Sequence, residues 1–391
     1  MEKITPKLLN WASDIEPDTL EQARRTSELP FVQPHLALMP DAHLGKGATV
    51  GSVIPTERAI IPAAVGVDIG CGMIAVRSQF SEDELRARGS RKRGLSPLRE
   101  AIERAVPLSA GARNRKVLPS AAPRVEELQA MARRDYGAVL AHWDLQLGSL
   151  GSGNHFIEVT LDETGAVWLF LHSGSRGIGN KLAQQHIAVA RRLAERTGLV
   201  LPDMDLAHLE EGTPEFDAYL RDLQWAQHFA LLNREEMMDR VVACLAEFMG
   251  ADVVEQERIN CHHNFSQPER HFGRDLWISR KGAIQADAGR LGLVPGSMGT
   301  ASYVVRGLGN ELSLHSSPHG AGRRLSRTKA RKQFSVAELR EAMAGIEYRD
   351  TDAFLDEHPL AYKDVDRVMA DAADLVEVLH TLRQVVNVKG D

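Results

Sequence analysis

Five short segments, spread over most of the chain, carry side chains that bind metal ions, and each segment is rich in glycine or polar residues. They are Asp68–Gly72, Asn154–His155, His172–Arg176, His262–Asn264 and His319–Arg323. Loops that present such groups from a rigid scaffold are the usual place for catalytic chemistry. These side chains can form one site only in a fold that brings five distant turns to one point. The pattern predicts a metal-dependent enzyme with one histidine beyond those needed for metal.

Composition narrows the class of protein. The 391 residues have a formal net charge of −6 and a pI near 6.2, which is unlike a general polyanion binder. Three cysteines do not make a disulfide framework, and the odd number favours a reducing compartment. The N-terminus lacks an apolar signal core and no run is long enough to span a membrane, so we expect a cytoplasmic protein. With no linker or repeat, we expect a single domain over residues 1–391.

Hydrophobic periodicity predicts a mixture of helices and strands. Alternating apolar residues indicate short strands, and longer stretches with a period near 3.6 indicate helices. The expected strands are 49–55, 73–76, 156–159 and 167–171, with a glycine-rich, strand-like stretch over 292–309. The expected helices are 97–106, 125–143 and 215–248, with further helices near Ser335 and Asp364. The predicted class is α+β, with the ligands at strand ends and turns.

Cys71 is the most distinctive candidate ligand. It lies between Gly70 and Gly72, three residues after Asp68, and glycines on both sides allow a sharp backbone turn that lets thiolate and carboxylate face one ion. Thiolate, carboxylate and imidazole together suit Zn, Mn, Fe or Co. A thiolate can also bridge two ions, an arrangement common in phosphoryl chemistry. The alternative is that Cys71 is a small buried hydrophobic residue, the commonest fate of a free cysteine.

Three histidines stand out by their context. His155 precedes an expected strand, His172 ends one, and His263 precedes an asparagine. A lone histidine is more often structural than a ligand, so each is weak evidence by itself. His262 and His263 would face opposite sides of a strand, and at most one of them should bind metal.

Other segments are suited to phosphate. The turn over residues 295–302 offers backbone N–H groups and hydroxyls to an anion, although it lacks the Gly-Lys-Ser/Thr ending of a P-loop. Arg176, after Ser-Gly-Ser, can hold a phosphate with two hydrogen bonds. His319 remains once three imidazoles are assigned to metal, and a neutral imidazole is a competent nucleophile. A run of basic residues over 323–332 follows it, and this position favours a groove that binds phosphates over a merely solvated loop.

These segments together resemble the RtcB family of RNA-splicing ligases, and the resemblance spans essentially the whole chain. No single segment decides it, but many occur in the same order. The segments that carry it are 39–47, 65–72, 151–158, 172–176, 295–299, 319–323 and 388–390. The fold that it implies is a single domain with central β-sheets flanked by helices and an active site built from loops at strand ends.

The resemblance implies a ligase that joins an RNA 3′-phosphate or 2′,3′-cyclic phosphate to a 5′-hydroxyl, using GTP and two Mn²⁺ ions. His319 would be the nucleophile that becomes guanylylated, and Cys71 would bridge the two ions. The implied manganese ligands are Asp68, Cys71, His155, His172 and His263. The positions that match contacts to the guanine nucleotide are Asn154, Glu158, Asn264, Ser297, Ser302, His319, Gly320, Tyr362 and Lys389. Asn154 and Arg176 match positions near the RNA termini, and an archease-type activator is a further partner that the family suggests.

Two other classes remain open from the residues alone. A two-metal phosphoesterase acting on RNA ends would use the same ligands with a metal-bound hydroxide and would leave His319 without a role. An RNA-binding protein without catalysis would need neither the metal ligands nor the nucleophile. Labelling with GTP separates the ligase from the phosphoesterase, and the RNA-binding alternative predicts that Cys71→Ala leaves RNA affinity intact and costs no activity.

Overall fold

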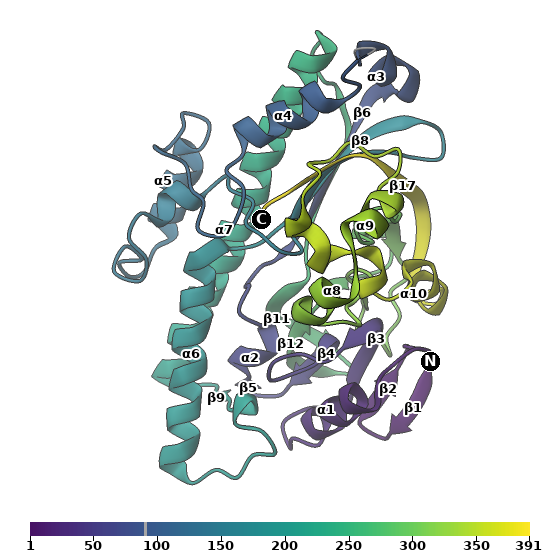
Figure 1. The fold of residues 1–391 in the computed structure, drawn as a ribbon. Coiled ribbons are helices and arrows are strands. Elements are labelled where there is room, and N and C mark those ends of the chain that lie inside the picture. The colour runs from purple at the N-terminus through teal and green to yellow at the C-terminus, as the bar shows by residue number, and fades with distance from the viewer. Residues whose placement is uncertain (90–91) are drawn as a thin grey trace.

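The computed structural model describes residues 1–89 and 92–391, which form two β-sheets surrounded by helices (Figure 1). The first sheet has the strand order β1-β2-β3-β4-β12-β11. Its strands are β1 Glu2–Thr5, β2 Leu8–Asn10, β3 Leu36–His43, β4 Val50–Thr56, β11 Asn264–His271 and β12 Arg274–Lys281. All neighbouring pairs in it are antiparallel except β2 and β3.

The second sheet has the order β10-β6-β8-β7-β17-β15-β14, and every neighbouring pair is antiparallel. Its strands are β6 Gly72–Ser81, β7 Phe156–Leu161, β8 Ala166–Ser173, β10 Glu255–His262, β14 Leu291–Val294, β15 Ser302–Gly307 and β17 Val376–Lys389. Only His263 separates β10 of this sheet from β11 of the first sheet. The two sheets therefore meet at a candidate metal ligand.

Two short ladders complete the strands. They pair β5 Ala59–Ile60 with β9 Leu209–Glu210, and β13 Ala283–Gln285 with β16 Ser316–Pro318. The α-helices are α1 Pro17–Ser27, α2 Pro62–Val65, α3 Glu82–Arg88, α4 Ser96–Ala105, α5 Ala122–Met131, α6 Arg176–Thr197, α7 Pro214–Met249, α8 Arg327–Gln333, α9 Val336–Ala342 and α10 Val365–Asp371. The 3₁₀ turns are η1 Trp143–Gln146, η2 Met204–Leu206, η3 Asp352–Glu357 and η4 Pro359–Ala361.

Helix α7 is the longest helix in the described part of the chain and supports the second sheet. Thr213 accepts a hydrogen bond from the backbone N–H of Phe216, Pro214 occupies the first turn, and Gly250 ends the helix in a left-handed conformation. It packs against β6 and β8 and against α4, α5 and α6 (Figure 1). Its buried residues include Asn233 and Arg234, two polar side chains directed at the turns of the site.

The predicted α+β class is confirmed, as are the expected strands and the helices beginning near Pro97, Glu215, Ser335 and Asp364. One helix prediction is partly wrong. The stretch 125–143 is helical only to Met131, and the chain then turns so that Trp143 packs edge-on against Trp225 of α7. The apolar period beyond Met131 reflects this packing and not a continued helix. No helix in the described ranges has the length and apolar character that crossing a membrane requires.

Candidate active site

The candidate metal ligands converge because four neighbouring strands of the second sheet begin or end at the same end of the sheet. In the ladder, His262 pairs with Gly72, Gly72 pairs with Ser173, and His172 pairs with Phe156. These pairs bring together the ends of β10 and β8 and the beginnings of β6 and β7. Candidate ligands lie at or next to these four positions, namely Cys71, His155, His172 and His263.

The glycines beside Cys71 are required by close backbone approach. A Cβ atom at Gly72 would lie 2.0 Å from the carbonyl oxygen of Cys261, so a side chain there would push β10 away from β6. Gly70 has φ +70, and a Cβ there would lie 2.8 Å from the Cβ of Ala230 on α7. Residues with side chains on either side of Cys71 would therefore move the thiol away from the histidines.

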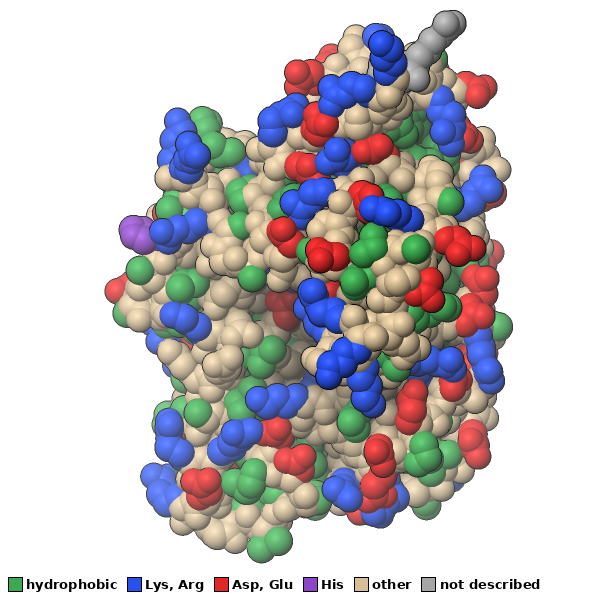
Figure 2. Space-filling view, viewed as in Figure 1, with side chains coloured by type: hydrophobic (Ala, Val, Ile, Leu, Met, Phe, Trp, Pro, Cys, Tyr) green, Lys and Arg blue, Asp and Glu red, His purple; other side chains and the backbone are tan. Residues whose placement is uncertain are grey.

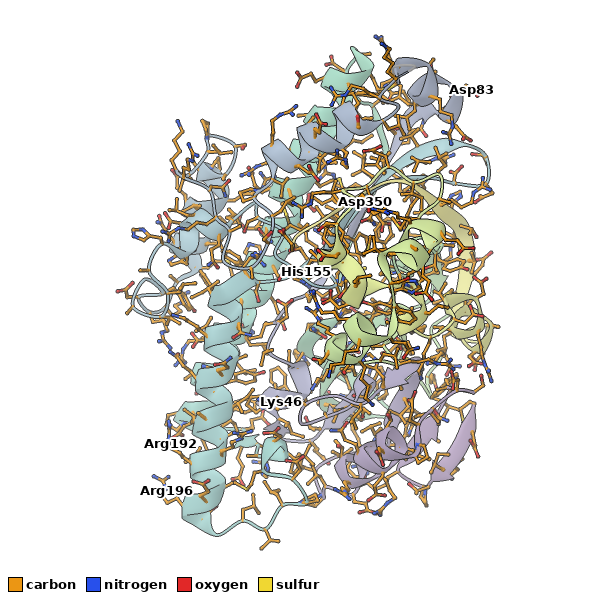
Figure 3. All side chains as sticks on the ribbon, viewed as in Figure 1. Lys46, Asp83, His155, Arg192, Arg196 and Asp350 are labelled. Carbon is orange, nitrogen blue, oxygen red and sulfur yellow. The ribbon has the colours of Figure 1, made fainter. Side chains whose placement is uncertain are left out.

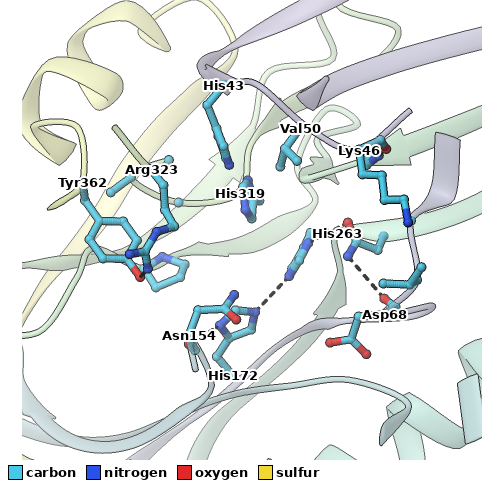
Figure 4. Close-up of a pocket in the computed structure, with 18 of the residues that line it drawn as sticks. His43, Lys46, Val50, Asp68, Asn154, His172, His263, His319, Arg323 and Tyr362 are labelled. Atoms are coloured by element: carbon cyan, nitrogen blue, oxygen red, sulfur yellow. Dashed lines mark hydrogen bonds between the residues drawn. The ribbon is translucent and has the colours of Figure 1, made fainter. Parts of the chain in front are cut away.

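The four side chains form one buried cluster. Cys71 Sγ lies 3.4 Å from His155 Nε2 and 3.3 Å from His172 Nε2. His172 Nε2 lies 2.9 Å from His263 Nε2, and Asp68 Oδ2 lies 3.1 Å from His155 Nε2. Of the two adjacent histidines, His262 faces elsewhere: its Nδ1 contacts the carbonyl of Gly70 and Arg234. Figure 4 shows the contact between His172 and His263 as a dashed line.

The hydrogen bonds of the rings direct their lone pairs into this cluster. His155 Nδ1 lies 3.0 Å from the carbonyl of Leu150, and His172 Nδ1 lies 3.1 Å from the carbonyl of Asn154. A carbonyl only accepts hydrogen bonds, so each Nδ1 carries the proton and each Nε2 presents a lone pair. Lone pairs this close together repel each other unless a cation lies between them. The buried cluster of Cys71, His155 and His172 can therefore bind a metal ion.

The electrostatic environment of these side chains also indicates that the cluster can bind a metal ion. Burial raises the pKa of the Cys71 thiol, and the Asp68 carboxylate raises it further. Burial also lowers the pKa of His172 and of His263 well below the usual value for histidine, so both rings are neutral at neutral pH. A divalent cation would reverse the effect on the thiol, because it stabilises the thiolate directly.

His319 lies beside this cluster, and its ring contacts a buried carboxylate. Its Nδ1 is 2.5 Å from Oδ2 of Asp41, a residue of β3 that is fully buried. The same oxygen accepts hydrogen bonds from the backbone N–H groups of His319 and Gly320, at 3.1 and 3.2 Å. The ring centroids of His319 and His263 are 4.6 Å apart. His319 is thus adjacent to the candidate metal ligands, and its Nε2 is left free of the Asp41 contact.

A cavity of about 670 Å³ passes over these residues. In Figure 4, Tyr362 and Arg323 lie at one side, Lys46 and Asp68 lie at the other, and His319 and His263 lie between them. The space-filling view shows a hollow at the centre of this face with Lys and Arg side chains around it (Figure 2). The volume is typical of sites for a nucleotide-sized ligand.

One end of the cavity contains a buried carboxyl with an unused oxygen. Glu158 of β7 is 2 % exposed, and its Oε1 accepts a hydrogen bond of 3.0 Å from the Asn387 amide. Its Oε2 has no hydrogen-bond partner among the described residues. Burial raises the pKa of Glu158 to about 8, although Lys389 nearby opposes the rise. A buried polar atom without a partner is costly, so the position is suited to a ligand that donates hydrogen bonds.

A network of charged and aromatic side chains lies beside Glu158. Arg323 donates to Glu357 Oε1 at 3.0 Å and to the Tyr362 hydroxyl at 2.9 Å, and the Tyr362 hydroxyl in turn donates to Glu357 Oε2. Lys389 Nζ lies 3.5 Å from Glu357 Oε2. These contacts hold Tyr362 and Lys389 at the cavity wall in fixed orientations.

The structure places most of the expected nucleotide residues in the cavity wall, but not all of them. The wall contains Asn154, Glu158, Asn264, Ser297, His319, Gly320, Tyr362 and Lys389. Ser302 is buried behind the wall, where its hydroxyl accepts a hydrogen bond from the backbone of Gly296. Arg176 also lies outside the wall, and its Nε donates to the Ser149 hydroxyl at 3.1 Å. The basic run after His319 is largely paired with acids: Arg324 with Asp14, Arg331 with Asp356, and Arg323 with Glu357.

Several residues of the cavity were not predicted as site residues. Asp41 and His43 belong to a segment that carries the family resemblance, but no local pattern indicated that the Asp41 carboxylate lies beside His319. Burial lowers the pKa of His43 to about 4. Burial also lowers the pKa of Lys281 to about 7, and its ammonium donates to the carbonyls of Lys46 and Ala63. Asn387 and Glu357 likewise acquire their places only through the fold.

Known proteins that resemble this chain in sequence belong to one family. The family model described as tRNA-splicing ligase RtcB matches residues 22–142 and 124–390. RNA-splicing ligase RtcB of Escherichia coli K12 is 47% identical, with 96% of this chain and 95% of the relative covered. tRNA-splicing ligase RtcB of Pyrobaculum aerophilum is 31% identical, covering 94% of this chain and 89% of the relative. With a family match over nearly the whole chain and these relatives, the protein belongs to the RtcB family of RNA-splicing ligases.

Proposed function

We propose that this protein is a GTP- and Mn²⁺-dependent RNA ligase that joins a 3′-phosphate or 2′,3′-cyclic phosphate end to a 5′-hydroxyl end through a guanylylated His319. The observation that carries the proposal is the place of His319. Its ring contacts the buried Asp41 and lies beside the candidate metal ligands. It also lines a cavity that contains, at one end, the Glu158 carboxyl with one oxygen free to accept hydrogen bonds.

The first step is the transfer of GMP to His319. The Asp41 carboxylate lies 2.5 Å from Nδ1 and its negative charge favours the proton on that nitrogen, so the lone pair of Nε2 attacks the α-phosphorus of GTP. A nitrogen–phosphorus bond forms, and the bond to the pyrophosphate oxygen breaks. Asp41 also stabilises the positive charge that the ring acquires during the attack, as a carboxylate beside a catalytic histidine does in other enzymes.

The residues that would hold Mn²⁺ in this proposal are Asp68, Cys71, His155, His172 and His263. Mn²⁺, when bound, offsets phosphate charge and helps to ionise the attacking hydroxyl. The donor set of this chain suits such an ion, since it combines carboxylate, thiolate and neutral imidazoles. The fixed Nδ1 contacts of His155 and His172 orient the rings before the metal arrives.

Guanine is proposed to bind at the Glu158 end. The free Oε2 of Glu158 is an acceptor for the N1–H and exocyclic amine of guanine, whereas adenine presents an acceptor at N1. Tyr362, Ser297, Gly320 and Lys389 form the surrounding wall and contact the nucleotide. Ser302 acts through the backbone of Gly296, and Asn264, whose side-chain amide donates to the carbonyl of Asp68, contributes from the part of the wall next to the metal ligands.

The remaining steps take place on RNA. A 2′,3′-cyclic phosphate is first opened by water, which breaks the bond between phosphorus and the 2′ oxygen and leaves a 3′-phosphate and a 2′-hydroxyl. An oxygen of the RNA 3′-phosphate attacks the phosphorus on His319, the nitrogen–phosphorus bond breaks, and RNA carrying a 3′-diphosphate link to guanosine forms. The 5′-hydroxyl then attacks the RNA phosphorus, loses its proton, and displaces GMP. Asn154 and Arg176 are proposed to hold the RNA termini; Asn154 forms part of the cavity wall, whereas Arg176 lies outside it.

Labelling with α-labelled GTP and Mn²⁺ tests the proposal. The wild-type protein is expected to acquire an acid-labile guanylyl label, His319→Ala to acquire none, and His228→Ala, changed at a surface histidine outside the cavity, to be labelled normally. A two-metal phosphoesterase, the alternative function, would release phosphate from RNA ends without taking up label. Absence of label on the wild-type protein would therefore refute the ligase.

Three further expectations belong to the same proposal. Residues 1–391 are expected to unfold as one domain, in a single thermal transition. The absence of a disulfide framework favours a cytoplasmic location. An archease-type activator is expected to raise the rate of guanylylation and not the affinity for RNA.

A further inference from the structure

The lining of the cavity also includes residues of α6 and of the loop that carries Lys46, and none of them is a proposed nucleotide contact; we call this part of the cavity the second arm. One face of α6 forms one wall of it, with Gln184, Ile187, Ala188 and Arg191 spaced as on one side of a helix. Lys46, Ala63 and the exposed Val67 also line this part of the cavity, and α2, which carries Ala63, packs against α6.

Packing between α6 and the loop that carries Lys46 gives the arm a defined shape. A Cβ atom at Gly47 would lie 3.0 Å from the Cβ of Asp205 and 3.1 Å from the Cβ of Ala63. Asp205 in turn forms an ion pair with Arg191 of α6. The loop that carries Lys46 is therefore held against the helix, and the carbonyl of Lys46 is held from below by Lys281.

The chemistry of the arm matches a nucleic-acid strand. Ile187, Ala188 and Val67 offer apolar surface to a ribose or base, Gln184 offers a hydrogen-bonding amide, and Lys46 offers positive charge to phosphates, whereas the charge of Arg191 is paired with Asp205. From Gln184 to Arg191 the helix rises by roughly 10 Å, which is about the rise of three stacked nucleotides.

The geometry of the last reaction step indicates which RNA strand lies in the arm. We propose, on the basis of the proposed ligase function, that the arm between α6 and Lys46 binds the first nucleotides of the RNA strand that bears the 5′-hydroxyl. In the last step the entering and leaving oxygens lie roughly in line at phosphorus. The leaving GMP has its guanine at the Glu158 and Tyr362 end, so the hydroxyl must enter from the opposite side. That side is occupied by Asp68 and Lys46 (Figure 4).

The other face of α6 provides a natural comparison. Arg192 and Arg196 project from the outer edge of the helix, away from His155 (Figure 3). Gln185 is exposed next to Gln184 but does not form part of the cavity wall. Substitutions on this outer face alter the charge of the helix without entering the arm.

The test uses Ala188→Glu, with Gln185→Glu as the matched control. Both place a carboxylate on an exposed position of α6, where glutamate is a good helix former, so both variants are expected to fold. With saturating 3′-phosphate strand, Ala188→Glu is expected to raise the KM for the 5′-hydroxyl strand by about tenfold or more, because the new charge faces phosphates. Gln185→Glu is expected to leave it within about twofold.

Two other measurements locate the defect. Formation of guanylylated protein and of the RNA–guanosine diphosphate intermediate, measured without any 5′-hydroxyl strand, is expected to continue at the wild-type rate in Ala188→Glu. Binding of a fluorescent 5′-hydroxyl RNA, followed by anisotropy, is expected to weaken in parallel with the KM. In Lys46→Ala the slope of log affinity against log salt is expected to fall by about one, as for one lost phosphate contact.

The inference is overturned if Ala188→Glu leaves the KM for the 5′-hydroxyl strand unchanged, or if it raises the KM for the 3′-phosphate strand in its place. Either result is distinct from failure of the proposed function, in which the wild-type protein would take up no label from GTP.

Discussion

At the scale of single residues, the site depends on groups that are buried and fixed before any substrate binds. Asp41 accepts a hydrogen bond from the backbone of His319 and places its carboxylate 2.5 Å from the ring, and Asn387 holds one oxygen of Glu158 while the other stays free. Each of these contacts determines which lone pair faces the cavity. Such pre-arranged donors and acceptors account for a large part of catalytic power in enzymes.

Asp41→Asn tests the role of the carboxylate beside His319. The amide is nearly isosteric, but it no longer stabilises the charged ring or selects the tautomer with the proton on Nδ1. The rate of guanylylation is expected to fall by about 100-fold or more, with GTP affinity changed by less than about threefold. Single-turnover uptake of label measures both quantities, and Asp374→Asn, at a surface carboxylate that binds Trp11, is the control. A normal rate in Asp41→Asn would contradict the role.

Glu158 predicts a pH dependence of nucleotide binding. Its pKa is about 8 in the folded protein against an ordinary value of 4.5. The folded state therefore holds more protons than the unfolded state between these values, and the contribution to stability falls as pH rises through that window. Guanine needs the ionised carboxylate as its acceptor, so GTP affinity is expected to rise from about pH 6 to about pH 8.

Glu158→Gln should remove most of this dependence and weaken GTP binding by about tenfold near pH 8, because the amide cannot ionise. Isothermal titration with GTP across the pH range measures the affinity at each pH, and Glu341→Gln, at an exposed carboxylate, is the control. An unaltered pH profile in Glu158→Gln would assign the dependence to another group.

At the scale of elements, the site is the meeting point of strand ends and one long helix. Arg234 of α7 is fully buried and donates to the carbonyls of Gly70 and Ser173, which adjoin Cys71 and His172. Its neighbour Asn233 donates to Ser149 and Gly174. Two consecutive side chains of one helix therefore hold the turns that carry the ligands, and the strand register sets the distances between them.

Arg234→Lys is expected to weaken Mn²⁺ binding by about tenfold to 100-fold, since a lysine cannot reach both carbonyls with the same planar geometry. Titration of the metal-free protein with Mn²⁺, monitored by calorimetry, measures the change without reference to activity. Arg240→Lys is the matched control, because Arg240 is also buried on α7 but donates to Gly148, Asn114 and Glu236. Equal losses in both variants would show a general effect of α7 packing.

The elements differ in how far the sequence predicts them. Helix α7 is predicted within one residue at each end, because its apolar period, its N-terminal proline and its terminal glycine agree. Helix α6 was not predicted, since the glycines and serines at its beginning suggest a loop and its polar outer face obscures the period. That Cys71, His155, His172 and His263 come together was expected from residue type and family resemblance, whereas their distances follow from a register that only the folded sheet defines. Asp41 could not be predicted from local pattern, because its partner lies 278 positions away.

At the scale of the whole molecule, the candidate metal centre lies where the two sheets join. His263 alone separates β10 from β11, and its backbone N–H donates to the carbonyl of Cys71 at 2.7 Å. A bound ion would therefore link strands of one sheet directly to the beginning of the other. Metal binding should then be coupled to the stability of the entire fold and not only to the order of a loop.

Mn²⁺ is expected to stabilise the protein against heat. At a free concentration about 100 times the dissociation constant, mass action contributes about 2.7 kcal/mol, which corresponds to a rise in Tm of several degrees. Differential scanning fluorimetry with Mn²⁺ or with a chelator measures the shift. Cys71→Ser should abolish most of it, and Cys244→Ser, at a buried cysteine outside the cluster, should retain it. A shift of full size in Cys71→Ser would mean that the ion binds elsewhere.

The division of the cavity walls between sheet edge and helix surface has an evolutionary consequence. The metal ligands and His319 lie at largely buried strand ends and turns, where almost any replacement disturbs several neighbours. The side chains that α6 presents to the cavity are surface positions of a regular helix and tolerate change. Substitutions at a few positions on that helix can therefore change which RNA ends are preferred as substrates, while the residues that carry out ligation stay the same.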